Sequence, residues 1–175
     1  MFEMACYDKR NKQLKERDAG FMNILFFLTP KSEIAYIYED DSIRQALEKM
    51  EYHKYSAVPI LTRDGRYVGT ITEGDMLWGI KNQYNLNLKE AEGIPVSTLS
   101  RRMDYLPVFA KSRMEDMIDR ALNQNFVPVV DDRKYFIGII TRKDIIKYYY
   151  EKGTAQQSAA ATIIRCPSGE RETVG

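Results

Sequence analysis

The sequence has little of what enzymes and metal proteins usually need. It contains a single histidine, His53, so a site with two histidine ligands is excluded. No Gly-x-x-x-x-Gly-Lys, Gly-x-Gly-x-x-Gly, His-Glu-x-x-His or Cys-x-x-Cys motif is present. His53 is next to Lys54 at the polar end of an expected helix, where we interpret it as structural. We therefore predict that the protein is not an enzyme and has no catalytic or metal site.

Cysteine, long apolar runs and net charge are scarce as well. Cys6 and Cys166 lie near opposite ends of the 175 residues, which suggests no disulfide framework. The longest apolar run, Ile24 to Leu28, is far shorter than the roughly 20 residues of a membrane span. A formal net charge of +1 provides no field that attracts nucleic acid or a membrane. Residues 1–20 are polar and charged, which is unlike a signal peptide, so we predict a cytoplasmic protein. We also predict no nucleic-acid or membrane partners.

The main positive feature of the sequence is an internal repeat. Five residues of one stretch return later in the same order, with the same spacing and no gap. They are Val58-Pro59, Gly69, Thr72 and Asp75 in the first copy and Val127-Pro128, Gly138, Thr141 and Asp144 in the second. Such a coincidence predicts a duplicated structural unit.

Each copy predicts the same order of elements, namely strand, helix, strand, strand, helix. The two consecutive strands form a hairpin, and Asp64-Gly65 is a strong turn signal in the first one. The helix before each hairpin begins with a capping-box pattern, Ser42-x-x-Gln45 in the first copy and Ser112-x-x-Glu115 in the second. We predict the strands at 34–38, 58–61, 67–71, 106–109, 127–130 and 135–140. Short helices are expected at 23–28 and 95–103.

This order and these motifs resemble the CBS domain, and two such units in tandem resemble a Bateman module. The resemblance covers about residues 22–150. It implies an α/β fold in which two pseudo-symmetric CBS repeats, each strand-helix-strand-strand-helix, form one disc-like module with two sheets back to back. The boundaries we expect are an N-terminal extension at 1–21, repeats at 22–80 and 94–150, a linker at 81–93 and a C-terminal tail at 151–175.

The Thr-x-x-Asp motifs stand at predicted helix starts and allow two interpretations. As a cap, the threonine with an acid three residues later stabilises a helix start by roughly 1 kcal/mol. As a site, the same helix start offers N–H groups to a phosphate, while the aspartate accepts hydrogen bonds from a ribose. In CBS domains this Thr and Asp have the second role. The resemblance therefore implies nucleotide contacts for Thr72, Asp75, Thr141 and Asp144.

The residues inside these motifs differ between the copies. Arg142 and Lys143 place two positive charges at a helix start, where they oppose the helix dipole. A bound phosphate explains them, and surface salt bridges to nearby acids are the alternative. In the first copy Glu73 stands at the matching position. This acidic residue disfavours a long polyphosphate there.

The residues before the first hairpin predict one base pocket. Ser56 and Ala57 are small enough to leave room for a flat base, and Tyr55 can lie against it. The second copy is two residues shorter here and has Phe126, which we expect to close the matching space. The predicted pocket is lined by Ala35, Tyr55, Ser56, Ala57, Thr72 and Asp75, with Arg142 and Lys143 reaching the phosphates.

Within the family, the two-repeat layout is most similar to small stand-alone bacterial CBS-pair proteins that bind cyclic di-AMP. The resemblance implies a regulatory sensor of adenine nucleotides, with cyclic di-AMP first and AMP or ATP next, that controls an unidentified partner protein. No catalytic cofactor is expected. The alternative is a ligand-free module that only dimerises or acts as a scaffold. Trp78 and Tyr148-Tyr149-Tyr150 are more aromatic than helix ends usually are, which favours a homodimer.

Overall fold

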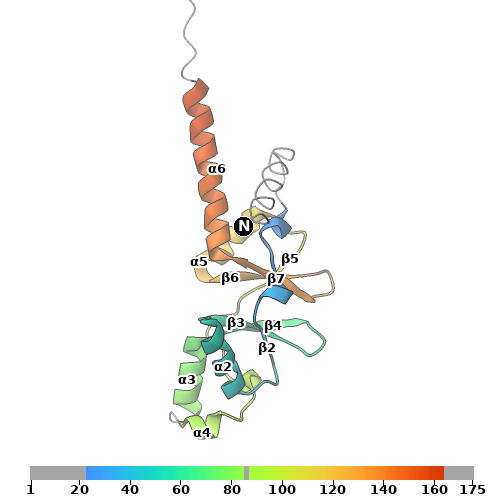
Figure 1. Ribbon diagram of the computed structural model, residues 1–175, viewed down its shortest axis with the longest axis vertical. Helices are drawn as coiled ribbons and strands as arrows, with labels where there is room; N and C mark the ends of the chain where they lie inside the picture. The colour runs from blue at the N-terminus through green and yellow to red at the C-terminus, as the bar shows by residue number, and fades with distance from the viewer. Residues whose placement is uncertain (1–22, 85–86, 164–175) are drawn as a thin grey trace, which may run out of the picture.

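The computed structural model describes residues 23–84 and 87–163. It contains two repeats, each with a small sheet and helices on one face of that sheet. The two sheets face each other at the middle of the molecule, and the helices lie on the outer sides (Figure 1). The predicted α/β fold with two pseudo-symmetric repeats is confirmed.

The first repeat forms a three-stranded sheet of order β2-β3-β4. Strand β2 is parallel to β3, and β3 is antiparallel to β4. The elements of this repeat are β2 (Ile37–Tyr38), α2 (Ile43–His53), β3 (Ala57–Leu61), β4 (Tyr67–Thr72) and α3 (Glu73–Tyr84). The predicted capping box is confirmed, because Gln45 N donates to Ser42 Oγ at 3.2 Å and Ser42 N donates to Gln45 Oε1 at 2.9 Å.

The second repeat repeats this pattern and adds a strand. Its elements are β5 (Val108–Phe109), η4 (Met114–Met117), α5 (Ile118–Asn123), β6 (Phe126–Val130), β7 (Phe136–Thr141) and α6 (Arg142–Ile163). The fourth strand, β1 (Thr29–Pro30), comes from before the first repeat and pairs antiparallel with β7. Gly138 makes this pairing feasible, because a Cβ there would lie only 2.2 Å from the Thr29 carbonyl oxygen. The segment that leads into β2 of the first repeat is therefore part of the sheet of the second repeat.

The capping box predicted at Ser112 is wrong. Ser112 N donates to the Phe109 carbonyl at 2.8 Å, which keeps Ser112 in the turn after β5. The helix start lies one residue later, where Arg113 N donates to Asp116 Oδ2 at 3.0 Å. This first turn is a 3₁₀ helix, η4, and the α-helix follows it at Ile118.

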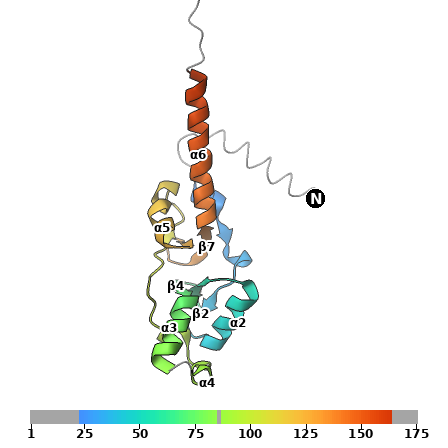
Figure 2. The same cartoon turned by 90° about the vertical axis from the view of Figure 1, so that its left-hand side faces the viewer.

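Several connecting segments also differ from the sequence predictions. The predicted helices at 23–28 and 95–103 are only 3₁₀ turns, η1 (Ile24–Phe27) and η3 (Val96–Thr98). The strands predicted at 34–38 and 106–109 shrink to two residues each, because only those residues pair with β3 and β6. The segment 81–93 holds the end of α3 and a short helix, α4 (Leu88–Ala91). Helix α6 continues past the expected boundary at 150 and extends away from its sheet (Figure 2).

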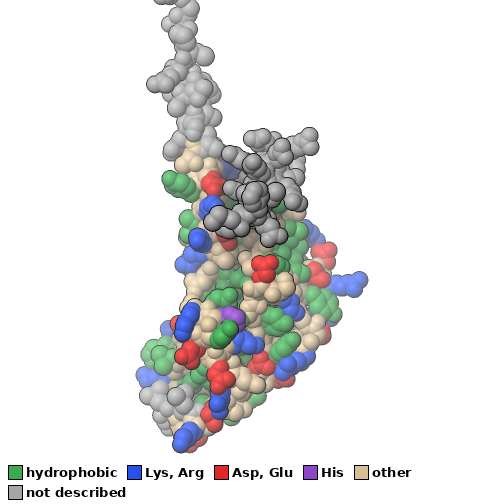
Figure 3. Space-filling view, viewed as in Figure 1, with side chains coloured by type: hydrophobic (Ala, Val, Ile, Leu, Met, Phe, Trp, Pro, Cys, Tyr) green, Lys and Arg blue, Asp and Glu red, His purple; other side chains and the backbone are tan. Residues whose placement is uncertain are grey.

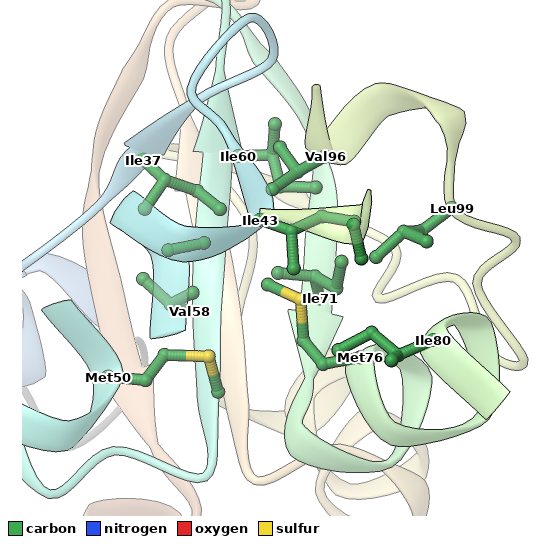
Figure 4. Close-up of a cluster of buried hydrophobic side chains, with 12 residues drawn as sticks. Ile37, Ile43, Met50, Val58, Ile60, Ile71, Met76, Ile80, Val96 and Leu99 are labelled. Carbon is green, nitrogen blue, oxygen red and sulfur yellow. The ribbon is translucent and has the colours of Figure 1, made fainter. Parts of the chain in front are cut away.

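Each repeat has a hydrophobic core between its sheet and its helices. In the first repeat, apolar side chains of β2, β3, β4, α2 and α3 meet residues of the segment before the second repeat (Figure 4). In the second repeat, Ile24 of η1 joins the core of α5, α6 and the sheet. A smaller cluster of Ala57, Tyr105 and Phe126 lies between the sheets. This small cluster is what positions the site described below.

The aromatic residues that suggested a dimer fall into two groups. Trp78 is 39% exposed and Tyr150 is 72% exposed. Tyr148 and Tyr149 instead pack on the second core, and the Tyr149 hydroxyl donates to the Met114 carbonyl at 3.1 Å. His53 stands between two rings, with its centroid 4.9 Å from that of Tyr52 and 5.4 Å from that of Tyr55.

Candidate functional site

A cleft of about 320 Å³ opens between the two repeats. Its walls are largely apolar, and its polar groups come from both repeats. The lining residues are Thr29, Glu33, Ile34, Ala35, Lys54, Tyr55, Ser56, Ala57, Pro59, Asn125, Phe126, Ile139 and Thr141. A mostly apolar cavity with a few convergent polar groups is the usual form of a small-molecule site.

Four of the residues predicted for the base pocket line this cleft: Ala35, Tyr55, Ser56 and Ala57. The turn after α2 brings three of them there. Lys54 adopts a left-handed conformation with φ 56°, and Tyr55 N then donates to the Met50 carbonyl at 3.0 Å. The chain thereby reverses and enters β3 at Ala57.

Of the two Thr-x-x-Asp threonines, Thr141 of the second repeat lines the cleft, whereas Thr72 and Asp75 are not part of the lining. The prediction that grouped all site residues of the first repeat in one pocket was therefore wrong in this respect. The reason is tertiary, because the start of β3 lies beside the second repeat. Asn125 Nδ2 donates to Ser56 Oγ at 3.5 Å across this boundary. The cleft thus combines the small residues of the first repeat with the helix start of the second.

In the Thr-x-x-Asp motif of the second repeat, only some of the hydrogen-bonding groups are paired with each other. Asp144 Oδ2 accepts a hydrogen bond from the Thr141 hydroxyl, and Asp144 N donates to Thr141 Oγ1 at 3.2 Å. Asp144 is half-buried. Asp144, like Asp75, does not itself line the cleft, but among the described residues its carboxylate accepts only this one bond and so retains acceptor capacity beside Thr141, which does line it.

In the Thr-x-x-Asp motif of the first repeat, the aspartate is buried and holds neighbouring backbone groups in place. Asp75 is 2% exposed, and its Oδ2 accepts from Thr72 N at 3.0 Å and from Thr72 Oγ1 at 2.8 Å. Its Oδ1 accepts from Arg102 N at 2.9 Å, which ties the segment before the second repeat to the start of α3. A ribose cannot reach Asp75 without opening the structure around it, because its side chain is buried and does not line the cleft. The capping interpretation therefore describes Asp75 better than the ligand interpretation.

On the other side Tyr105 is buried between the sheets, and a hollow of about 360 Å³ remains beside it, lined among others by Leu106, Tyr67, Arg101 and Lys134. The pairing of Val108 with Val129 matches that of Ile37 with Ile60, which places Tyr105 at the position of Ile34. Tyr105 is 5% exposed and packs against Ala57 and Phe126. The predicted closure of this space by Phe126 is wrong, because Phe126 lines the first cleft and Tyr105 is the aromatic residue buried at the equivalent position. No local sequence pattern points to this role of Tyr105.

Tyr67 holds Tyr105 in place. The Tyr67 hydroxyl donates to the Tyr105 carbonyl at 2.8 Å, and the Thr70 hydroxyl lies 2.8 Å from it and can donate in return. Burial raises the pKa of the Tyr67 phenol above its ordinary value of 10.0, because the phenolate loses water there. The phenol is therefore protonated at neutral pH and can act as this donor.

The two predicted phosphate cations are not in the cleft. Arg142 Nε donates to the Gln124 carbonyl at 2.9 Å, and Arg142 lines a separate apolar hollow between α5 and α6. Lys143 is exposed and does not line the cleft. The charged residues that do line it are Lys54 and Glu33, neither of which was predicted. Elsewhere, acidic and basic side chains are interspersed over the visible face (Figure 3).

Comparison with known proteins assigns the duplicated unit. The family model of the CBS domain matches residues 27–82 and 95–151. The chain belongs to the CBS domain family. Each match contains one copy of the Thr-x-x-Asp motif, so the internal repeat is a pair of CBS domains. The predicted tandem CBS pair is confirmed.

The CBS pair is similar to several curated proteins of Methanocaldococcus jannaschii. It is 27% identical over 139 residues to MJ1426, a match that covers 63% of this chain and 83% of that protein. It is also 26% identical over 115 residues to an inosine-5'-monophosphate dehydrogenase of the same organism. That match covers 66% of this chain and only 21% of the enzyme. CBS pairs like this one are thus parts of some longer chains.

Solved structures confirm the fold. The Listeria monocytogenes protein CbpB, solved in complex with c-di-AMP (cyclic di-AMP), has a TM-score of 0.67 at 19% identity. That match covers 77% of this chain and 99% of CbpB. CBSX2, a CBS-pair protein of Arabidopsis thaliana, has a TM-score of 0.61 at 23% identity in its complex with AMP, covering 77% of this chain and 99% of that one.

The described residues contain neither a membrane-spanning helix nor a cluster of metal-binding side chains. No helix among them is long and apolar enough to cross a membrane. They also contain no group of three or more His, Cys, Asp or Glu side chains that could hold a metal ion.

Proposed function

We propose that this CBS pair is a regulatory module that binds one adenine nucleotide in the open cleft and thereby controls a partner protein. The base lies between Ala35, Tyr55 and the start of β3. The ribose meets Asp144, and the phosphate lies near Thr141 at the N-terminus of α6. The single observation that carries the proposal is the shape of the cleft, which joins the small residues of one repeat to the helix start of the other.

Helix α6 is suited to the phosphate side of this site. Its first N–H groups lack partners within the helix, and its dipole places partial positive charge at the same end. Thr141 stands just before the helix, and its hydroxyl, which now donates to Asp144 Oδ2, would have to turn to a phosphate when the nucleotide binds. Similar CBS pairs have been solved with c-di-AMP and with AMP, which supports an adenine nucleotide as the ligand class.

The cleft volume favours a small nucleotide. At about 320 Å³ it lies at the lower end of the 300–1,000 Å³ typical of ligand pockets. One base with its ribose fits such a space, as in AMP. Cyclic di-AMP fits only with its second nucleoside outside the cleft, and the two extra phosphates of ATP would extend toward Glu33. We therefore rank AMP and cyclic di-AMP above ATP.

A second candidate function, a ligand-free dimerisation or scaffold module, is favoured by a different surface. Leu122 is 72% exposed and Ile146 is 59% exposed, and both line the apolar hollow between α5 and α6 together with Tyr150. Exposed apolar surface of this kind marks an interaction site. Dimerisation through the helices leaves the cleft open, so the two functions are compatible.

A thermal-shift screen tests the nucleotide proposal. AMP, cyclic di-AMP, ATP and adenosine are added to the wild type and to two matched variants, Ala35→Phe and Leu106→Phe. Leu106 has the register position of Ala35 but lies in the second repeat and outside the cleft. At 100 times the dissociation constant a ligand adds about 2.7 kcal/mol of stability, which raises the melting temperature by several degrees.

We expect the shift in the wild type and in Leu106→Phe and its loss in Ala35→Phe. No shift with any of the nucleotides in the wild type would leave the scaffold as the better function. An equal shift in both variants would show that nucleotides bind elsewhere.

A further inference from the structure

Few charged side chains line the cleft, and none of them forms an ion pair with another described residue. Of its lining residues only Glu33 and Lys54 are charged. Lys54 is exposed, and among the described residues it has no ion pair and no side-chain hydrogen bond. Glu33 likewise has no ion pair within the described part of the chain. Within residues 23–84 and 87–163, the Lys54 ammonium group at the cleft therefore has no partner that holds it.

The backbone conformation of Lys54 is unfavourable for a lysine, which suggests that its side chain has a function. Lys54 is the C-cap of α2 and has φ 56°, a left-handed conformation that glycine or asparagine adopts at much lower cost. Its backbone N–H donates to the Met50 and Glu51 carbonyls and so performs the capping. Any residue type supplies that N–H. The lysine side chain thus adds nothing to the cap and occupies a position that disfavours it.

The helix dipole does not account for the residue either. A cation near the C-terminus of a helix is favourable, but positions in the last turn provide the same effect with ordinary helical dihedral angles. His53 already occupies the last turn of α2. What only position 54 provides is access to the cleft.

We infer that Lys54 binds the phosphate of the nucleotide and sets the charge that the cleft accepts. This inference rests on the proposed function and names the recognition element that Arg142 does not supply, because Arg142 lines a separate hollow and not the cleft. One ammonium group matches one phosphate or phosphodiester. Glu33 on the same cleft repels further negative charge. The ligand class is therefore a nucleotide with a single phosphate at the cleft.

The test uses a substitution that removes the charge and relieves the backbone. Lys54→Gly places the residue type that suits φ 56° at the cap, so the protein should fold at least as well as the wild type. Lys54→Arg keeps the charge. Lys134→Gly is the matched control, because Lys134 is the other non-glycine residue with positive φ, 68°, and lies outside the cleft.

Calorimetric titration with AMP, cyclic di-AMP and adenosine gives the readout. We expect Lys54→Gly to weaken AMP and cyclic di-AMP by about tenfold or more, as for loss of a charge-assisted hydrogen bond, and to leave adenosine unchanged. Lys54→Arg and Lys134→Gly should bind all three compounds as the wild type does.

If Lys54→Gly binds AMP and adenosine with the affinities of the wild type, the inference about Lys54 is wrong, while the proposed nucleotide function stands. Equal losses for AMP and adenosine would also overturn that inference, because Lys54 would then shape the cleft and not recognise charge. If none of the three compounds binds the wild type, the proposed function fails, and the inference about Lys54 fails with it.

Discussion

Tyr105 lies edge-on to Phe126, with the ring centroids 5.3 Å apart and the ring planes at 61°. This pair makes the two halves of the molecule unequal. Phe126 faces the open cleft, while Tyr105 is buried between the sheets on the other side. The duplicated sequence therefore yields two hollows with different linings, the cleft at Ala57 and Phe126 and a second one of about 360 Å³ beside the buried Tyr105.

Removing the Tyr105 ring should destabilise the protein strongly. In Tyr105→Ala we expect a loss of about 3–5 kcal/mol in the free energy of unfolding, because a buried aromatic side chain leaves a cavity between the sheets. Tyr150→Ala is the control, since Tyr150 is 72% exposed and should change stability by less than about 0.5 kcal/mol. Urea denaturation measures both. Similar losses in the two variants would show that Tyr105 is not packed between the sheets.

The pairing of β1 with β7 predicts unequal effects at two equivalent glycines. A Cβ at Gly138 would lie 2.2 Å from the Thr29 carbonyl, whereas a Cβ at Gly69 would meet the flexible end of Arg101 at 2.7 Å. Gly138→Ala should therefore cost about 3 kcal/mol of stability, at the upper end for overpacking, and Gly69→Ala less than about 1 kcal/mol. Thermal unfolding of the two variants checks this. The reverse order would contradict the contact between β1 and β7.

Stability should fall at alkaline pH through Tyr67. Its pKa is raised in the folded state by burial, so the unfolded chain loses the phenol proton first. The stabilisation is complete below the ordinary pKa of 10.0 and is lost as the pH rises above it. The free energy of unfolding, measured by chemical denaturation between about pH 8 and about pH 11, should decline less in Tyr67→Phe than in the wild type. Tyr52→Phe, at an 82% exposed position, should decline as the wild type does.

The two aspartates of the repeated motif should differ in what they support. Asp75→Ala removes a buried carboxylate that accepts from the N–H groups of Thr72 and Arg102 and should cost about 2–3 kcal/mol of stability. Asp144→Ala loses one hydroxyl bond at a half-buried position and should cost about 1 kcal/mol. Chemical denaturation of the free proteins measures both. Equal losses would mean that the motifs have the same structural role.

Local patterns in the sequence predicted most of the fold. The Val-Pro, Gly and Thr-x-x-Asp repeats predicted both hairpins and the helices after them, because strand register and helix caps depend on neighbouring residues. Ser42 succeeded as a cap for this reason. Ser112 failed because the turn after β5 engages its backbone and moves the helix start by one residue.

The site was predicted less completely, because it forms between repeats. Ala35, Tyr55, Ser56 and Ala57 were placed correctly in one cleft, since they are close along one repeat. That Thr141 completes the cleft depends on how the sheets face each other, which no local pattern contains. That Lys54 lines the cleft was not predicted, because its position depends on a backbone angle at the end of α2.

The central claim is that one nucleotide binds per chain, held by Asp144 and not by Asp75. Calorimetric titration of AMP into the wild type, Asp144→Ala and Asp75→Ala tests it most directly, at a temperature where all three are folded. The account predicts one AMP per chain in the wild type, binding weakened by about tenfold or more in Asp144→Ala, and near wild-type affinity in Asp75→Ala. Two AMP molecules per wild-type chain, or a loss of affinity in Asp75→Ala with none in Asp144→Ala, would contradict it.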